Sequence, residues 1–189
     1  MVAWIVVESM FGNTRKIADE IAGQLIAELP VEVRNVLDAP RVLPEDVTLL
    51  VVGGPTHAFG MTRESTRDDA VERGSSADPA VGVREWLDAL TIPHWGVVAV
   101  AFDTRIRKRF VPGAASRGIA QRLERLGCTM MEAPISFYVE DVCGPLLAQE
   151  ENRAATFGLL LLRDLERRGM LVGPAGRDAV TTRENQGPS

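Results

Sequence analysis

Two short loops of this sequence combine residue types that suit the binding of an anion and of a flat ring. The first, ESMFGNT at 8–14, follows an apolar run and leads into a segment with helical spacing. The start of a helix favours an anion through its unpaired N–H groups and the positive end of its dipole. Ser9 and Thr14 add hydroxyls, while Gly12 permits a close backbone approach. A single phosphate group therefore fits this loop, and the alternative is that Ser9 or Asn13 only caps the helix.

The second loop, GGPTHAFGM at 53–61, also follows an apolar run. Its Gly-Pro entry and its aromatic residue beside a glycine could lay backbone amides and a ring against a flat heterocycle. His57 or Phe59 would stack on that heterocycle. In the alternative interpretation Phe59 belongs to the core and His57 is an exposed polar residue.

A third loop, FDTRIRKRFVPG at 102–113, is basic. Arg105, Arg107, Lys108 and Arg109 fall within five positions. A basic run is usually a solvated surface, but its place after a central strand also allows it to face an anion.

The elements that must position these loops alternate along the chain. Apolar runs predict strands, and 3.6-residue spacing predicts helices. The expected strands are 2–7, 31–36, 48–52, 97–102 and 135–139; the expected helices are 14–29, 83–90, 113–126 and 146–168, with a polar surface excursion at 66–82. This pattern predicts an α/β fold with a doubly wound, five-stranded parallel sheet. We expect one domain at 1–168 and a mobile C-terminal tail at 169–189.

In open parallel sheets, ligands bind at the carboxyl ends of the strands, where the strand order reverses. If the order is 2-1-3-4-5, the first and third strands flank that point. The first and second loops would then lie together.

These residues resemble the flavodoxin family, whose fold is a five-stranded sheet of order 2-1-3-4-5 that binds flavin mononucleotide (FMN). ESMFGNT resembles the family's phosphate-binding loop, and GGPTHAFGM resembles the second flavin loop of quinone-reductase relatives. The resemblance implies that Ser9, Met10, Phe11, Gly12, Asn13 and Thr14 surround the phosphate, that Pro55, Thr56, His57, Phe59 and Gly60 line the isoalloxazine, and that Phe102, Asp103, Thr104 and Arg105 take the third-loop place.

Two departures from the family pattern bear on function. Phe11 replaces the usual Thr, and the third loop is basic and lacks the stacking Tyr of small electron carriers. Those carriers present an acidic rim to their reductases. The leading interpretation is an FMN-binding redox protein that transfers electrons through bound flavin. An NAD(P)H- or quinone-linked flavin oxidoreductase and a degenerate protein-binding module without flavin stay open as alternatives. No catalytic residue pair stands out.

Composition and charge fit a single globular domain of ordinary size. The 189 residues are 46% hydrophobic and 25% charged, with a net charge of −5 that gives no reason to expect nucleic acid as a partner. The apolar run at 2–7 is too short for a signal peptide or a membrane span. Cys128 and Cys143 have neither zinc-site nor CxxC spacing. We therefore expect a cytoplasmic protein with reduced thiols and no bound metal.

Overall fold

The computed structural model describes residues 1–57, 60–107 and 113–171. Phe59, Lys108 and Arg109, which the sequence analysis singled out, lie outside the described residues, as does the tail from residue 172 onward.

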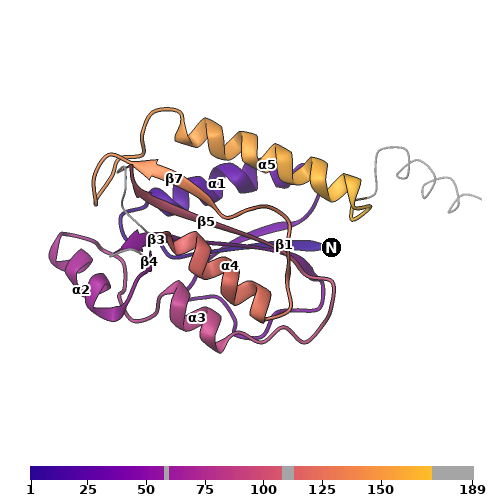
Figure 1. The fold of residues 1–189 in the computed structure, drawn as a ribbon, viewed down its shortest axis with the longest axis horizontal. Helices are drawn as coiled ribbons and strands as arrows, with labels where there is room; N and C mark the ends of the chain where they lie inside the picture. Colours follow the sequence, from indigo (N-terminus) through magenta and orange to yellow (C-terminus); the bar gives the residue numbers. More distant parts are fainter. Residues whose placement is uncertain (58–59, 108–112, 172–189) are drawn as a thin grey trace, which may run out of the picture.

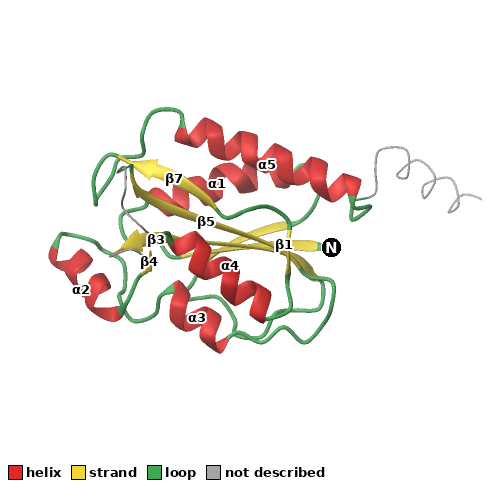
Figure 2. Cartoon of the chain, in the orientation of Figure 1, coloured by secondary structure: helices red, strands yellow, loops and turns green. Residues whose placement is uncertain are grey.

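A mostly parallel sheet forms the centre of the molecule, with helices on both faces (Figures 1 and 2). Its strands are β1 (Val2–Val7), β2 (Val31–Asn35), β3 (Val47–His57), β5 (Val98–Ile106), β6 (Thr129–Met130) and β7 (Ile135–Val139), and β4 (Gly60–Met61) pairs antiparallel with β3. The order β2-β1-β3-β5, with β7 beside β5, confirms the predicted 2-1-3-4-5 arrangement. The fifth place is divided, because β6 pairs with residues 98–99 of β5 and β7 with residues 102–106.

Two hydrophobic clusters sandwich the sheet. The side chains of β1 alternate between them: Trp4 and Val6 lie on the face covered by α3 (Val83–Ala89) and α4 (Ala115–Arg125), and Ile5 and Val7 lie on the other. Helices α1 (Asn13–Leu25) and α5 (Glu150–Arg167) cover that second face (Figure 1). Burial on both faces explains why the strand is apolar throughout.

The register of the three central strands aligns their carboxyl ends. Val7 lies opposite Gly53, and Gly53 lies opposite Phe102. The loops that follow β1, β3 and β5 therefore leave the sheet at one edge.

The structure corrects several of the expected boundaries. Strands β3 and β5 continue to His57 and Ile106, so residues 102–105 belong to a strand rather than to a loop. Helix α1 ends at Leu25 and is followed by a turn, rather than continuing to Pro30. Helix α2 (Glu64–Glu72) overlaps the start of the excursion predicted at 66–82. It buries only two residues and so lacks a clear apolar stripe.

Among the described helices, none has the length and apolar character needed to cross a membrane.

Candidate functional site

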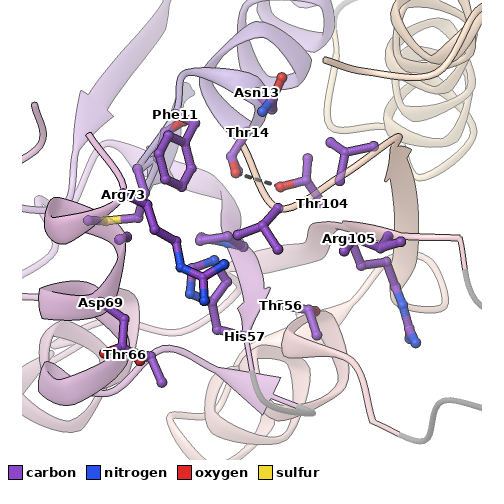
Figure 3. A pocket seen from close by; sticks show the side chains of 17 residues that line it. Phe11, Asn13, Thr14, Thr56, His57, Thr66, Asp69, Arg73, Thr104 and Arg105 are labelled. Atoms are coloured by element: carbon purple, nitrogen blue, oxygen red, sulfur yellow. Dashed lines mark hydrogen bonds between the residues drawn. The ribbon is translucent and has the colours of Figure 1, made fainter. Parts of the chain in front are cut away.

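A cavity of about 280 Å³ lies at the carboxyl edge of the sheet, next to the point where the strand order reverses between β1 and β3. The first loop and the start of α1 supply Ser9, Met10, Phe11, Asn13 and Thr14; the end of β3 supplies Pro55, Thr56 and His57; β5 supplies Thr104, Arg105 and Ile106; α2 and its end supply Thr66, Asp69, Ala70 and Arg73; and the chain around β7 supplies Val139 and Val142. Figure 3 shows these side chains converging from elements far apart in the sequence. The location is where open parallel sheets bind ligands.

The first loop reaches α1 through Gly12, which caps the helix in the left-handed conformation at φ 82°. Glycine adopts this conformation without steric cost. The first turn of α1 carries no acidic residue. Within the described chain, the backbone amides of residues 10–14 donate to no protein acceptor, and the side chain of Ser9 accepts a 3.2 Å hydrogen bond from the Arg15 amide. Helix α1 therefore begins with several open N–H groups facing the loop.

The two neighbouring helices begin differently, because buried carboxylates from the sheet cap them. Glu8, directly after β1, accepts a 2.8 Å hydrogen bond from the Val83 amide at the start of α3. Asp103 on β5 accepts a 3.0 Å hydrogen bond from the Ser116 amide in the first turn of α4. Each carboxylate supplies a negative charge where the helix dipole favours one. Among the described residues, no carboxylate caps the start of α1.

Glu8 also anchors the chain that carries α2. Its carboxylate accepts a 2.5 Å hydrogen bond from the Thr62 hydroxyl. Burial raises the pKa of Glu8, while the hydrogen bonds from Thr62 and Val83 and the charge of Arg67 act in the opposite direction. Arg67 is itself buried and donates to the Pro79 carbonyl at 2.6 Å. This polar cluster fixes the segment between β4 and α3 against the end of β1.

A second link holds the first loop in place. The buried hydroxyl of Ser75 donates a 2.6 Å hydrogen bond to the carbonyl of Met10. Because Ser75 lies three residues after α2, this bond joins the end of that helix to the first loop.

The polar residues at the start of α1 are already engaged with neighbouring strands and loops. The hydroxyls of Thr14 and Thr104 lie 2.8 Å apart and are hydrogen-bonded to each other (Figure 3). The side chain of Asn13 donates to the carbonyl of Cys143 at 3.2 Å. Asn13 therefore does not cap the helix through its side chain. Instead it joins the start of α1 to the loop after β7.

The second loop begins where a glycine is required. A Cβ at Gly53 would lie 2.1 Å from the Phe102 ring, so any larger residue would clash with that ring. Further along, the Thr56 hydroxyl donates to Asp103 at 2.9 Å and accepts from the Ala115 amide at 2.8 Å. Thr56 thus lines the cavity while also capping α4.

His57 lies at the end of β3 beside α2. Burial lowers the pKa of His57, and the nearby charge of Arg73 acts in the same direction; contact with the Thr66 backbone and the charge of Asp69 oppose these effects. Figure 3 shows the His57 ring next to the Arg73 guanidinium inside the cavity. His57 is accordingly not the exposed polar residue of the alternative interpretation.

The structure brings most of the predicted site residues to this cavity, but not all of them. Phe102 is fully buried and packs edge-on against Phe137, and Asp103 is fully buried beneath the cavity as a helix cap. Gly12 lines an adjoining hollow that shares residues 9–11 with the cavity, and Gly60 pairs with His57 in β4 without lining it. Their contacts with a ligand stay predictions.

Sequence reasoning missed the wall supplied by α2. Thr66, Asp69 and Arg73 recur at spacings of three and four residues, which is the only local signal for a helix face here. Nothing in the sequence says that this face meets the cavity. In the part of the chain that the structure describes, no group of His, Cys, Asp and Glu is arranged to hold a metal ion.

Comparisons with known proteins identify the architecture. No protein-family model matches the sequence, and a search of curated protein sequences gives no significant match. Solved structures do match. Flavodoxin 1 from Bacillus cereus is similar with a TM-score of 0.63 at 18% identity, over 86% of this chain and 98% of that one. An archaeal flavodoxin gives 0.60 at 16% identity, over 88% and 99% of the two chains.

A flavodoxin from Streptococcus pneumoniae TIGR4 gives a TM-score of 0.58 at 18% identity, over 84% of this chain and 96% of that one. Each of these three proteins is covered almost completely, so the match concerns the whole architecture. At these identities the likeness establishes the fold alone. The order of the strands, the placement of the helices and these neighbours together show that the chain has the flavodoxin fold.

Proposed function

We propose that this chain is a flavodoxin-like redox protein that binds FMN in the cavity at the carboxyl edge of the sheet and transfers electrons through it. The open start of α1 supports this proposal most strongly. The amides of residues 10–14 meet no acceptor within the described chain, and no described carboxylate caps the start of α1, whereas Glu8 and Asp103 cap α3 and α4. A phosphate monoester supplies the missing negative charge.

The residues present fit FMN in chemistry. Gly12 turns the backbone so that successive amides can converge on one anion, and the hydroxyl of Thr14 lies at the same place. The cavity volume of about 280 Å³ is close to the lower end of the range for small-molecule sites. Its lining is mixed, with hydroxyls near α1 and apolar groups such as Ile106 and Val139 further away. Such a gradient suits a ligand with one charged end and one flat, mainly apolar end.

The roles of the chain's own residues follow from this fit. The amides of residues 10–14 and the Thr14 hydroxyl would hold the phosphate, and Ser75 would keep the loop in shape through its bond to Met10. Phe11 and His57 would contact the isoalloxazine ring, and Thr104, Arg105 and Ile106 of β5 would form one wall of the cavity. When bound, FMN would supply one- and two-electron chemistry. Flavodoxin 1 from Bacillus cereus, which has a similar structure, was solved in its oxidised form, and this supports the proposal of a redox role.

An NAD(P)H- or quinone-linked oxidoreductase is the second candidate. Among the described residues that line the cavity, Phe11 and His57 are the only ones with aromatic rings, and β7 contributes Val139 rather than its Tyr138. Arg107 and Arg153 instead lie over the Tyr138 ring, with their guanidinium carbons 5.6 and 5.5 Å from its centroid. If no aromatic side chain covers one face of the flavin ring, that face is accessible to a hydride donor or a quinone.

FMN titration of the apoprotein tests the proposal, with flavin fluorescence quenching as the readout. Thr14→Val removes one hydroxyl and should weaken FMN binding about 10- to 100-fold, because hydrogen bonds to a charged group contribute about 1.5–3 kcal/mol. Thr48→Val is the matched control, since Thr48 lies at the opposite end of β3 and its hydroxyl has no partner among the described residues.

Riboflavin, which lacks the phosphate, should bind wild type and Thr14→Val equally. Failure of the wild-type protein to quench FMN fluorescence at micromolar concentrations would refute FMN binding. Steady-state oxidation of NAD(P)H with a quinone acceptor then separates the two candidates, because a pure carrier shows no turnover without a partner protein.

A further inference from the structure

Arg73, at the end of α2, brings a positive charge to the cavity. Its side chain lines the cavity, and it forms no ion pair with any described residue, including Asp69 one helical turn earlier. The other arginine of this helix, Arg67, is buried and paired with Glu85 at 3.2 Å. Arg73 is therefore available to a ligand in a way that Arg67 is not.

The chain around Arg73 is held firmly against the first loop. Ser75, two residues later, is bonded to the Met10 carbonyl, and Ala70 is buried one turn earlier. Arg67 ties the same helix to the segment before α3 through the Pro79 carbonyl. The backbone that carries Arg73 is thus fixed on both sides, and the guanidinium reaches the cavity from a defined position.

The described cavity lining carries a net positive charge. Asp69 is its only acid, against the two guanidinium groups of Arg73 and Arg105. Arg105 donates to the Gly113 carbonyl at 2.5 Å. His57 adds no full charge near pH 7, because burial and Arg73 lower its pKa below its usual range. Because the pKa of His57 is lowered, Arg73 is the positively charged member of this neighbouring pair at pH 7.

The position of Arg73 separates it from the presumed phosphate contacts. Figure 3 shows its guanidinium next to the His57 ring, at the end of β3, whereas Thr14 lies at the start of α1. If the phosphate occupies the start of α1, the remainder of the ligand extends into the rest of the cavity, whose lining includes His57 and Arg73.

We propose that Arg73 faces the ring of the bound flavin and makes this cavity bind reduced FMN more tightly than oxidised FMN. This inference rests on the proposed function. Reduced FMN has taken up two electrons and one proton, so its ring carries one additional negative charge. A cation close to that charge stabilises the reduced form selectively. The preference follows from charge alone and holds whether electrons arrive from a reductase or from a nicotinamide.

The test compares Arg73→Gln with Arg163→Gln, which removes the same charge from an exposed position on α5 outside the cavity lining. The dissociation constant of oxidised FMN is measured by fluorescence, and the midpoint potential of bound FMN by anaerobic dithionite titration. Arg73→Gln should weaken binding of reduced FMN roughly three- to tenfold, with oxidised FMN changed less than about twofold. Arg163→Gln should change neither, and Arg73→Lys should retain the wild-type preference.

Two results would overturn the inference while leaving FMN binding intact. An unchanged potential in Arg73→Gln means that the guanidinium does not face the ring. An equal loss for oxidised and reduced FMN, with riboflavin unaffected, means that Arg73 binds the phosphate instead. A wild-type protein that binds no FMN in either redox state would overturn both this inference and the proposed function.

Discussion

Gly53 provides the sharpest test of the packing beneath the site. A Cβ at this position would lie 2.1, 2.4 and 2.5 Å from three carbons of the Phe102 ring, whereas carbon atoms in contact are about 3.5 Å or more apart. The ring would have to retreat by about 1.4 Å. It has no space to do so, because Phe102 is fully buried and packs edge-on against Phe137 at 6.0 Å between centroids. Phe137 in turn contacts Phe157.

We therefore expect Gly53→Ala to lower the free energy of unfolding by about 3 kcal/mol, the upper end of the range for overpacking a core. For a chain of this length, such a loss lowers the melting temperature by about 6–12 °C. Urea unfolding followed by circular dichroism measures the free energy directly. Gly54→Ala is the matched control in the same strand, since the nearest atom to its Cβ would be 3.6 Å away. It should be neutral or stabilise by up to about 1 kcal/mol.

A double variant separates the proposed clash from other effects of the substitution. Phe102→Leu is destabilising by itself, but it removes the ring, so Gly53→Ala should cost at least about 1 kcal/mol less in that background. The reasoning is refuted if Gly53→Ala is as mild as Gly54→Ala, or if its cost is the same with and without the Phe102 ring.

Two further predictions concern titratable groups. The pKa of Glu8 is raised above 4.5 in the folded protein, so the native state binds this proton more tightly than the unfolded chain does. The resulting contribution to stability is complete below pH 4.5 and is lost as pH rises through the native pKa. The unfolding free energy of Glu8→Gln should consequently decline less than that of wild type from pH 4.5 upward, and parallel curves in urea titrations would contradict this. Burial raises the pKa of the Cys128 thiol to about 11, whereas Cys143 is exposed. Iodoacetamide at pH 8 should therefore modify Cys143 alone in the native protein and both cysteines in urea, as peptide mass spectrometry would show; equal native labelling would count against it.

The sequence alone determined the main elements of the fold. The apolar runs at 2–7 and 97–102 predicted buried parallel strands, because a strand covered on both faces carries apolar residues at successive positions instead of alternating with polar ones. Helical spacing after Gly12 and before Pro30 predicted α1 for a similarly local reason. The first loop could be proposed as an anion site because its residues are contiguous in the sequence. The alternation of strands and helices predicted parallel pairing, whereas the strand order came from the resemblance to flavodoxins.

The wall of the cavity that α2 supplies could not be predicted from the sequence. Helix α2 buries only two of its residues, so its sequence lacks the apolar periodicity that predicts a packed helix. Only the folded structure shows that one face of α2 lines the cavity. The opposite error occurred at β5. Polar residues from Asp103 onward look like a loop, but parallel pairing with β7 extends the strand to Ile106.

The roles of the two buried acids depended entirely on tertiary structure. Glu8 and Asp103 each directly follow an apolar run, yet their partners are the Val83 and Ser116 amides. The first pair is 75 residues apart in the chain. Local sequence reports which residues prefer burial and which spacing suits a helix. It does not report which helix start a buried carboxylate will meet, because the packing of α3 and α4 on the sheet decides that.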